Sequence, residues 1–288
     1  MTQSPPVSDI LAAIERFYDA VPRKRADAEE HGPLTLFVRR GEGWPYYARP
    51  TVDHPGPVTV ADVAAVRARQ RELAVPEAFE WVLETTPGLD AVAESTGLRV
   101  ERCPLLVLSG EPREVPLPAG VSLSMITAQN RDLAAVQAVA NVAFGAPDTA
   151  VGAAGPAERD AVAAALPAGE AAAWRTSVSD GTLVAAAVRG GEGALAGPLC
   201  TGSYQHAQGV AEIVGVGTLP AARRHGLAAA VTAALARRAL DAGNHTVFLS
   251  AQDDDVARVY ERVGFRRIGT ACIAEAPARV ENGNVGGA

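Results

Sequence analysis

The stretch Leu219-Pro-Ala-Ala-Arg-Arg-His-Gly-Leu-Ala-Ala-Ala-Val231 decides how this sequence is interpreted. It follows an apolar run, and an alanine-rich run typical of a helix begins after Gly226. The first N–H groups of a helix have no partner within the helix and carry partial positive charge, so they attract a phosphate. Gly226 lets a ligand approach the backbone, and Arg223 and Arg224 can add charge-assisted contacts. A solvated turn before a helix has the same sequence pattern as a phosphate-binding loop. The surrounding sequence must therefore distinguish these two interpretations.

The composition excludes several classes of protein. The chain has 288 residues, of which 48% are hydrophobic, and this favours a packed core over extensive disorder. A net charge of −7 argues against a general binder of nucleic acid or anionic membranes. The N-terminus lacks a secretion signal, and no apolar run approaches the roughly 20 residues of a membrane span. The three cysteines are far apart and show no metal-ligand spacing. We expect a cytoplasmic protein without a metal, a nucleic-acid partner or a membrane partner.

Prolines and glycines divide the chain. Residues 110–120 contain three prolines and two glycines, a composition that does not belong inside a helix or strand. We therefore predict an N-terminal domain at 1–109, a linker at 110–118, a larger domain at 119–276 and a disordered tail at 277–288.

Hydrophobic periodicity predicts a mixed α+β fold for the larger domain. The expected strands cover residues 121–126, 172–179, 182–188, 210–218, 246–250 and 265–275, and the expected helices 129–144, 156–166, 224–242 and 253–263. Asp180-Gly181 is a strong hairpin signal between the second and third of these strands, and the glycine-rich segment 190–197 is predicted to form a long loop.

Three features in order resemble one family. Arg223-Arg-His-Gly226-Leu-Ala228 matches the pyrophosphate loop Arg/Gln-x-x-Gly-x-Gly/Ala of the GCN5-related N-acetyltransferases. The preceding Glu212–Pro220 is similar to the fourth strand of that family, and Val256–Phe265 is similar to its late helix, which ends in Tyr-x-x-x-Gly-Phe. The resemblance covers residues 119–276. It implies an acyl-CoA N-acyltransferase fold (GNAT), with a central mixed, twisted sheet flanked by helices.

The resemblance also implies a binding site for acetyl-CoA as cosubstrate. The pantetheine arm would pair with the strand at 216–218, where the Val216 N–H would polarise the thioester carbonyl, and the pyrophosphate would lie on the N–H groups of 224–229. The residues expected at this site are Val216, Gly217, Thr218, Arg223, Arg224, His225, Gly226, Leu227, Ala228 and Ala229.

The family transfers its acyl group by direct attack of an amine on the thioester in a ternary complex. Such a reaction needs a base for the amine and an acid for the leaving thiolate. Glu212 begins the fourth strand, where the family often has a base that acts through water; a solvated carboxylate at a strand end is the equal alternative. Tyr260 matches the tyrosine that serves as the acid, and a packing tyrosine is the alternative.

Two features depart from the family pattern. Asp253 stands where the family often has an asparagine near CoA, and an aspartate there loses an amide donor and adds negative charge. Gly215 and Gly217 are unusual in the fourth strand; they either mark a bulge that separates the strands or merely weaken the strand. Elsewhere, we interpret Cys200 as an ordinary loop thiol. We interpret Trp174 and Phe144 as core residues, and the alternative is that they line an acceptor pocket.

The N-terminal domain contains an echo of the end of the chain. Asp90–Arg99 aligns with Ala257–Arg266, and each segment lies between two predicted strands and contains a glycine at the matched position, Gly97 or Gly264. Ala93 stands in the place of Tyr260, and no phosphate loop precedes this copy. We interpret the N-terminal domain as a smaller, degenerate GNAT-like α/β domain that walls the acceptor pocket or completes a sheet; chance similarity of two helices is the alternative.

The sequence thus predicts an N-acetyltransferase that acts on a primary amine of a small molecule or peptide. A non-catalytic CoA-binding module and a transferase of another acyl group remain alternatives. The acceptor cannot be read from the residues, and a homodimer is compatible with the family.

Overall fold

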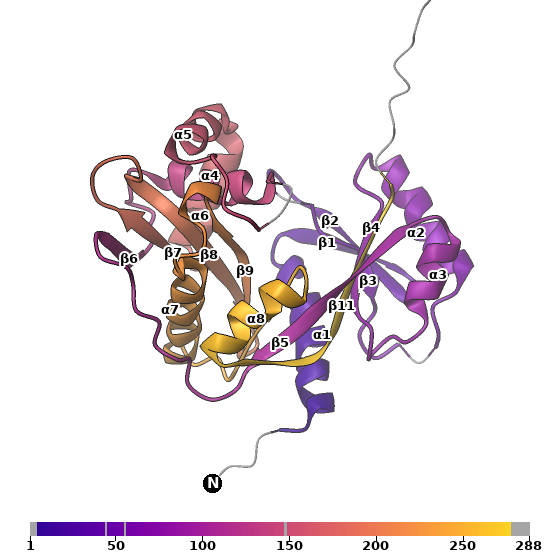
Figure 1. Cartoon of the computed structure of the whole chain (residues 1–288). Helices are drawn as coiled ribbons and strands as arrows, with labels where there is room; N and C mark the ends of the chain where they lie inside the picture. Colours follow the sequence, from indigo (N-terminus) through magenta and orange to yellow (C-terminus); the bar gives the residue numbers. More distant parts are fainter. Residues whose placement is uncertain (1–4, 44, 55, 147–148, 278–288) are drawn as a thin grey trace, which may run out of the picture.

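One mixed sheet of eight strands runs through both halves of the molecule (Figure 1). The structure, a computed structural model, describes residues 5–43, 45–54, 56–146 and 149–277. The strand order is β4 (Ala78–Val82), β11 (Phe265–Glu275), β5 (Arg99–Leu108), β10 (Thr246–Ser250), β9 (Val210–Thr218), β8 (Gly197–Ala207), β7 (Leu183–Gly190) and β6 (Val121–Met125). β9 and β10 are parallel, and the other neighbours are antiparallel. The mixed sheet and its flanking helices confirm the predicted fold class.

A smaller sheet extends the N-terminal half, by which we mean the described residues up to 109. It consists of β1 (Ala26–His31), β2 (Leu34–Arg39) and β3 (Arg49–Pro50), in that order. Ala48 bridges it to β4 in parallel: the Ala48 N–H donates to the Ala78 carbonyl, and the Glu80 N–H to the Ala48 carbonyl, both at 3.0 Å. The two sheets therefore meet at Ala48.

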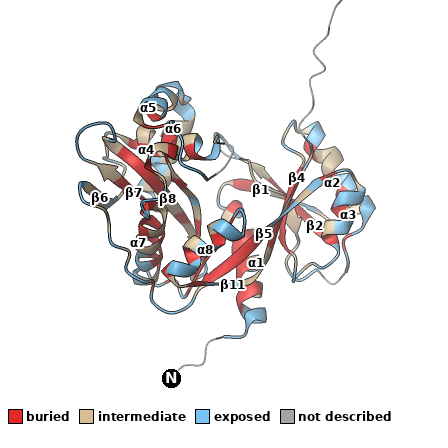
Figure 2. Ribbon diagram, viewed as in Figure 1, coloured by how far each residue is buried: buried red, intermediate tan, exposed pale blue. Residues whose placement is uncertain are grey.

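Helices cover both faces of the large sheet (Figure 2). They are α1 (Val7–Arg23), α2 (Val60–Glu72), α3 (Leu89–Ser95), α4 (Leu133–Phe144), α5 (Pro156–Ala165), α6 (Ala168–Ser179), α7 (Leu227–Asp241) and α8 (Asp254–Val263), with a 3-10 turn at Pro220–Ala222. Leu106 of β5 packs in a cluster with residues of α7 and α8, whereas its neighbour Leu105 packs with residues of α1. Alternate side chains of a strand point to opposite faces, so β5 is buried on both sides.

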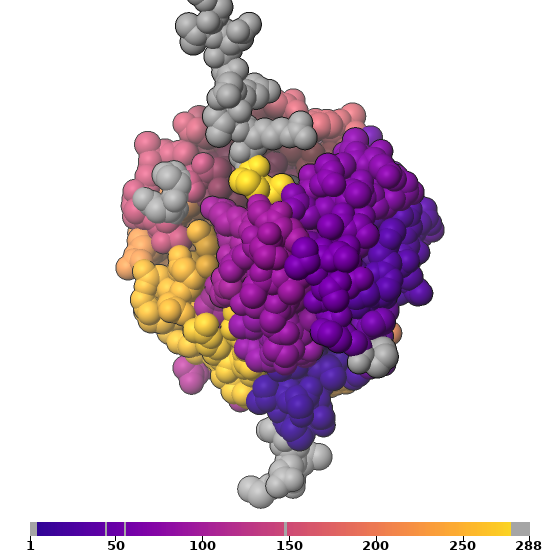
Figure 3. Space-filling view, turned by 90° about the vertical axis from the view of Figure 1, so that its right-hand side faces the viewer, coloured from indigo at the N-terminus to yellow at the C-terminus, as the bar shows by residue number. Residues whose placement is uncertain are grey.

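Each of the two similar segments, one in the N-terminal half and one at the end of the chain, inserts its last strand between strands of the other. The first runs β4–α3–β5 and the second β10–α8–β11, and Gly97 and Gly264 both have positive φ where their helices end. β5 lies between β10 and β11, and β11 lies between β4 and β5. The register of β5 and β11 runs from Phe265 opposite Leu108 to Glu275 opposite Arg99. Figure 3 shows the result on one face, where the yellow end of the chain lies beside purple segments of the N-terminal half.

The predicted linker joins two parts of one sheet. Residues 110–118 contain no helix or strand, as expected. They connect β5 to β6, and both strands belong to the same eight-stranded sheet. The division into two domains stays a prediction, because the last strand before the linker is buried inside the sheet of the half that follows it. The predicted tail lies, from residue 278, outside the described residues.

Two element predictions are wrong. Residues 172–179, predicted as a strand, belong to α6, and the residue pair Asp180-Gly181 turns a helix into β7. The alanine-rich start of α6 has high helix propensity, and this outweighs the apolar alternation near its end. The sequence does not predict β8, because its Gly-Pro start and internal Gly202 are unfavourable in a strand. The glycine-rich segment 190–197, predicted as a long loop, contains the turn of the β7–β8 hairpin.

Candidate active site

A cleft of about 1990 Å³ lies between the two halves of the molecule. The N-terminal half lines it with α1, the β2–β3 connection, β3 and β4, and the C-terminal half with α4, α6, β8, β9, the start of α7 and α8. The N-terminal half therefore both completes the sheet and walls the cleft, the two roles predicted for it as alternatives.

Strand β9 opens one of its edges to this cleft. It pairs with β10 only from Val210 to Glu212, opposite Thr246 to Phe248. The β8–β9 register shifts between Thr201 opposite Gly217 and Ser203 opposite Val214, and Gly215 has φ +64°. This is a bulge between β8 and β9, so Gly215 marks a bulge, whereas Gly217 keeps its pairing with Thr201. Beyond Glu212 the backbone edge that faces β10 has no strand partner among the described residues, and an extended ligand can pair with it.

Gly217 brings helix α4 close to this edge. A Cβ at Gly217 would lie 2.9 Å from the Ala143 Cβ and 3.3 Å from the Ala140 Cα. Gly217 therefore allows α4 to pack closely against β9, because any side chain at this position would push α4 away from the strand.

The loop after β9 is braced by Arg223. Its guanidinium donates to three carbonyl oxygens, those of Thr218 at 3.3 Å, Ala150 at 2.9 Å and Ala143 at 2.9 Å. These bonds fix the loop to α4 and to the segment after α4. Arg223 lines the cleft, but its side chain has a structural function that the sequence did not indicate.

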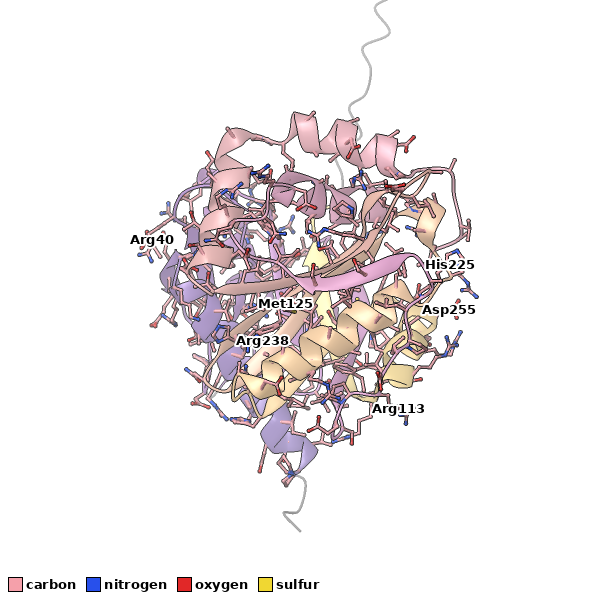
Figure 4. All side chains as sticks on the ribbon, turned by 90° about the vertical axis from the view of Figure 1, so that its left-hand side faces the viewer. Arg40, Arg113, Met125, His225, Arg238 and Asp255 are labelled. Carbon is pink, nitrogen blue, oxygen red and sulfur yellow. The ribbon has the colours of Figure 1, made fainter. Side chains whose placement is uncertain are left out.

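Helix α7 points its first turn into the cleft. Gly226 precedes it with φ +75°, and the first helical bond joins the Ala230 N–H to the Gly226 carbonyl at 3.0 Å. The N–H groups of Leu227, Ala228 and Ala229 precede that bond, and all three residues line the cleft together with Arg224 and Gly226. A helix start of this kind attracts an anion. His225 is exposed and lies at the edge of the molecule (Figure 4), outside the cleft lining.

Tyr260 lies on α8 and reaches the cleft from a buried position. It is 7% exposed, and its ring meets that of Phe265 edge-on, with 6.4 Å between the centroids. Burial, and to a smaller extent the neighbouring Cys200, raises the pKa of the Tyr260 phenol well above its ordinary value. The phenol therefore keeps its proton at neutral pH and can donate it to a thiolate that forms beside it.

Cys200 is a buried thiol of strand β8, not a loop residue as predicted. The Thr218 hydroxyl donates to its Sγ at 3.2 Å, and burial raises the pKa of the thiol to about 12. Since the thiolate is the reactive form, the interpretation as an ordinary thiol agrees with its environment.

Glu212 lies in the cleft at the point where β9 and β10 separate. The Tyr18 hydroxyl donates to its Oε1 at 3.2 Å. Burial and the neighbouring Glu80 raise the pKa of Glu212 to about 8, although Arg49 and Tyr18 act in the opposite direction. A carboxyl group that gains and loses a proton near neutral pH suits a general base, and a solvated strand-end carboxylate does not describe it.

Tyr18, Arg49 and Glu80 are functional candidates that the sequence analysis missed. All three come from the N-terminal half and line the cleft beside Glu212. One signal was available: Glu80 is the only charged residue in the strand Ala78-Phe-Glu-Trp-Val82, and a charge in an apolar strand requires a buried partner. Trp174 and Phe144 also line the cleft, and the 63% exposure of Phe144 contradicts its interpretation as a core residue.

Asp253 caps helix α8. Its side chain accepts a hydrogen bond from the Val256 N–H at 2.8 Å. Gln252 and Asp255 line the cleft, and Asp253 is not among the lining residues. Aspartate and asparagine are equally good N-caps, so the departure from the family pattern leaves the cap of α8 intact.

The helix of the N-terminal half that corresponds to α7 begins differently. At the start of α2 the Thr59 hydroxyl accepts from the Asp62 N–H at 3.3 Å, and the Asp62 carboxylate accepts from the Thr59 N–H at 2.8 Å. This capping box uses the N–H groups that would hold a phosphate and adds a negative charge. Ala93, which stands in the place of Tyr260, is buried in the core. The N-terminal copy therefore lacks the two features, a free helix start and a tyrosine, that the C-terminal copy presents to the cleft.

Among the residues that the structure describes, no group of three or more His, Cys, Asp or Glu side chains is arranged to hold a metal ion. Nor does any helix in these ranges have the length and apolar character needed to cross a membrane.

Comparisons with known proteins agree with this geometry. Residues 157–265 match the model of the acetyltransferase (GNAT) family. A solved structure described as a GCN5-related N-acetyltransferase from Kribbella flavida is 26% identical, has a TM-score of 0.67, and the match covers 93% of this chain and 96% of that one. No curated protein matches the chain.

More distant solved structures share the fold over most of the chain. A GCN5-related N-acetyltransferase from Sphaerobacter thermophilus matches at 16% identity with a TM-score of 0.57, over 94% of this chain and 93% of that one. A tandem GNAT protein from the clavulanic acid biosynthesis pathway matches at 18% identity with a TM-score of 0.52, over 85% and 78% of the two chains. The fold of this chain is thus found, over most of its length, in other proteins.

Proposed function

We propose that this chain, whose residues 157–265 belong to the acetyltransferase (GNAT) family of acyltransferases, transfers an acetyl group from acetyl-CoA to a primary amine. One observation carries the proposal. The open edge of β9, the first turn of α7 and the Tyr260 side chain all line the same cleft. These are the three parts that a CoA thioester requires: an edge for the pantetheine amides, donors for the pyrophosphate, and an acid beside the sulfur.

Each part of acetyl-CoA has a place in this proposal. The pantetheine arm would pair with Val216, Gly217 and Thr218, and the Val216 N–H would stabilise the oxyanion that develops on the thioester carbonyl. The pyrophosphate would accept hydrogen bonds from the N–H groups of Leu227, Ala228 and Ala229. Arg224 would add charge, whereas Arg223 would act by holding the loop in place.

The reaction needs no covalent acyl-enzyme. The amine nitrogen forms a bond to the thioester carbon while the carbon–sulfur bond breaks, and the electron pair of that bond leaves with sulfur. Glu212 takes the amine proton through a water molecule, and Tyr260 donates its proton to the thiolate, so the products are an amide and free CoA. Proton exchange with solvent then restores both residues.

The alternative of a non-catalytic CoA-binding module loses its main support. It rested on Asp253 and on the glycines of β9, and these residues have structural functions as a helix cap and as a bulge. The acceptor is proposed to be a primary amine of a small molecule or peptide that enters between the two halves, because both halves line the cleft.

Two measurements test the proposal. Isothermal titration with acetyl-CoA should show binding, and the absence of binding at millimolar ligand would overturn it. An amine-library screen that detects free CoA should then identify acceptors. Binding without consumption of thioester across the whole library would favour the non-catalytic CoA-binding module. Faster turnover with propionyl- or succinyl-CoA would assign another acyl donor.

A further inference from the structure

Glu212 faces a buried group of ionisable side chains that belong entirely to the N-terminal half. Helix α1 contributes Tyr18 and Glu15, β3 contributes Arg49, and β4 contributes Glu80. The strand partners of Glu212 itself are uncharged, namely Gln205 on β8 and Phe248 on β10. The charges that act on Glu212 therefore come from the N-terminal half and not from the two strands that pair with β9.

Tyr18 is held rigidly in this group. It is 2% exposed, and its ring packs edge-on against Phe248, with 5.5 Å between the centroids. The guanidinium of Arg49 covers the ring at 3.9 Å from its centroid. Its hydroxyl donates to Glu212 Oε1. The ring is thus fixed by packing, and only the hydroxyl depends on Glu212.

Arg49 and Glu80 form an ion pair beside this hydrogen bond. Their side chains are 11% and 10% exposed, so little water screens them. Arg49 Nη1 is buried and has no hydrogen-bond partner in the described structure. Glu15 accepts from the Val82 N–H and the Thr85 hydroxyl, and these bonds hold it at the edge of the group. Glu80 is thus the negative charge, and Arg49 the positive charge, that act on Glu212 most directly.

We infer that the N-terminal half controls the protonation of Glu212, with Tyr18 as a positioning residue and the Arg49–Glu80 pair as the source of the field. The inference gives the degenerate half a function in the reaction besides its contribution to the fold. Its consequence for catalysis rests on the proposed function, because Glu212 is the base only if the chain transfers an acyl group to an amine.

The geometry predicts opposite effects for two substitutions. Tyr18→Phe keeps the packed ring and removes a donor to the ionised carboxylate, so Glu212 should hold its proton to higher pH. Glu80→Gln removes a nearby negative charge and leaves Arg49 to act on Glu212, so Glu212 should release its proton at lower pH. Each shift should be about one pH unit, the usual size for one hydrogen bond or one near charge.

The test is a titration of the Glu212 carboxyl by NMR in the full chain labelled with ¹³C-glutamate, with the signal assigned by its loss in Glu212→Gln. Tyr204→Phe and Glu77→Gln serve as matched controls. Tyr204 is a buried tyrosine of β8 outside the cleft lining, and Glu77 is a glutamate of the N-terminal half that pairs with Arg67 and Arg71. Neither control should move the midpoint.

The outcomes separate this inference from the proposed function. Unmoved midpoints in Tyr18→Phe and Glu80→Gln would overturn the inference; if Glu80→Gln does not fold because Arg49 loses its partner, the isosteric Tyr18→Phe decides alone. Shifted midpoints in a chain that neither binds acetyl-CoA nor consumes it would support the inference and overturn the proposed function. If both the inference and the proposed function are correct, the acid limb of the pH profile of kcat/KM should shift in each variant by as much as the Glu212 titration midpoint.

Discussion

At the scale of single residues, burial sets the chemistry of the two proposed proton-transfer groups. Tyr260 and Glu212 both line the cleft, and burial is the largest cause that raises the pKa of each. The consequences differ because the groups differ: a phenol with a raised pKa remains a donor, whereas a carboxyl group with a pKa of about 8 can take up a proton near neutral pH. Burial is therefore the main cause that gives the proposed acid, Tyr260, and the proposed base, Glu212, suitable pKa values in the same cleft.

Tyr260→Phe should lower kcat by about a hundredfold, the lower end of what a general acid contributes. The ring keeps its contact with Phe265, so the Kd of acetyl-CoA should stay within about twofold, since the phenol acts only on the sulfur that leaves. Steady-state kinetics and calorimetry measure the two quantities. Tyr204→Phe is the control, and unchanged turnover of Tyr260→Phe would remove Tyr260 from the role of the acid.

Glu212 should make the fold less stable as the pH rises. Its pKa is about 8 in the folded chain and roughly 4.3 in an unfolded one, so the folded state binds the proton more tightly. That contribution is complete below the unfolded value and is lost as the pH rises to the folded value. Urea unfolding between pH 5 and about 9 should therefore show a larger loss of stability for the wild type than for Glu212→Gln, and parallel curves would contradict the raised pKa.

At the scale of elements, two backbone irregularities build the binding face. The bulge at Gly215 shifts the register of β9 against β8 beside the open edge, and Gly226 turns the chain so that the first turn of α7 faces the cleft. Both residues have positive φ, which costs a glycine little and other residues about 1–2 kcal/mol. The proposed binding site therefore depends on backbone geometry as much as on side-chain chemistry.

Gly226→Ala should weaken acetyl-CoA binding by about tenfold and destabilise the fold by about 1 kcal/mol. A Cβ at this position meets no atom within 4 Å, so the effect comes from the backbone alone. Gly243→Ala is the matched control, because Gly243 follows the other end of α7 with φ +85° and equally open space. Both variants should lose stability, and equal affinity for acetyl-CoA in the two would contradict the predicted cradle.

At the scale of the whole molecule, the exchange of strands makes the halves dependent on each other. Without β5, strands β10 and β11 would have no common neighbour, and the buried side chains of Leu105, Leu106 and Val107 would leave two clusters of the core. The same arrangement brings Tyr18, Arg49 and Glu80 to Glu212. Folding and the environment of the proposed base thus depend on one feature of the topology.

Residues 119–276 alone should therefore fail to fold cooperatively, although they contain every residue of the resemblance. Chemical denaturation followed by circular dichroism would test this. The control is the full chain cut within 110–118 by a protease at an introduced site. It should keep its fold, because the cut crosses no strand. A stable isolated fragment that binds acetyl-CoA would show that β5 is dispensable.

The sequence by itself determined the family resemblance and the fold class, and it predicted the position of the phosphate loop. These depend on local patterns: a turn glycine before a helix, a tyrosine at fixed distance from a Gly-Phe pair, and an echo with the same order of elements. Such signals lie within short segments, where propensity and spacing act directly. The helix at 172–179 was misread because its apolar spacing fits both structures, and β8 because glycine and proline hide its strand character.

Only the tertiary structure decided which segments meet. The exchange of β5 and β11, the shared cleft and the group around Glu212 join residues that are far apart in the chain, such as Tyr18 and Glu212. Apart from the charge of Glu80 in an apolar strand, no local pattern marks these contacts, because a pairing between distant strands is selected by the burial of the complete sheet. The pKa of a carboxyl group likewise depends on everything that surrounds it. The sequence thus predicted the residues of the proposed reaction, and the fold supplied the environment of its proposed base.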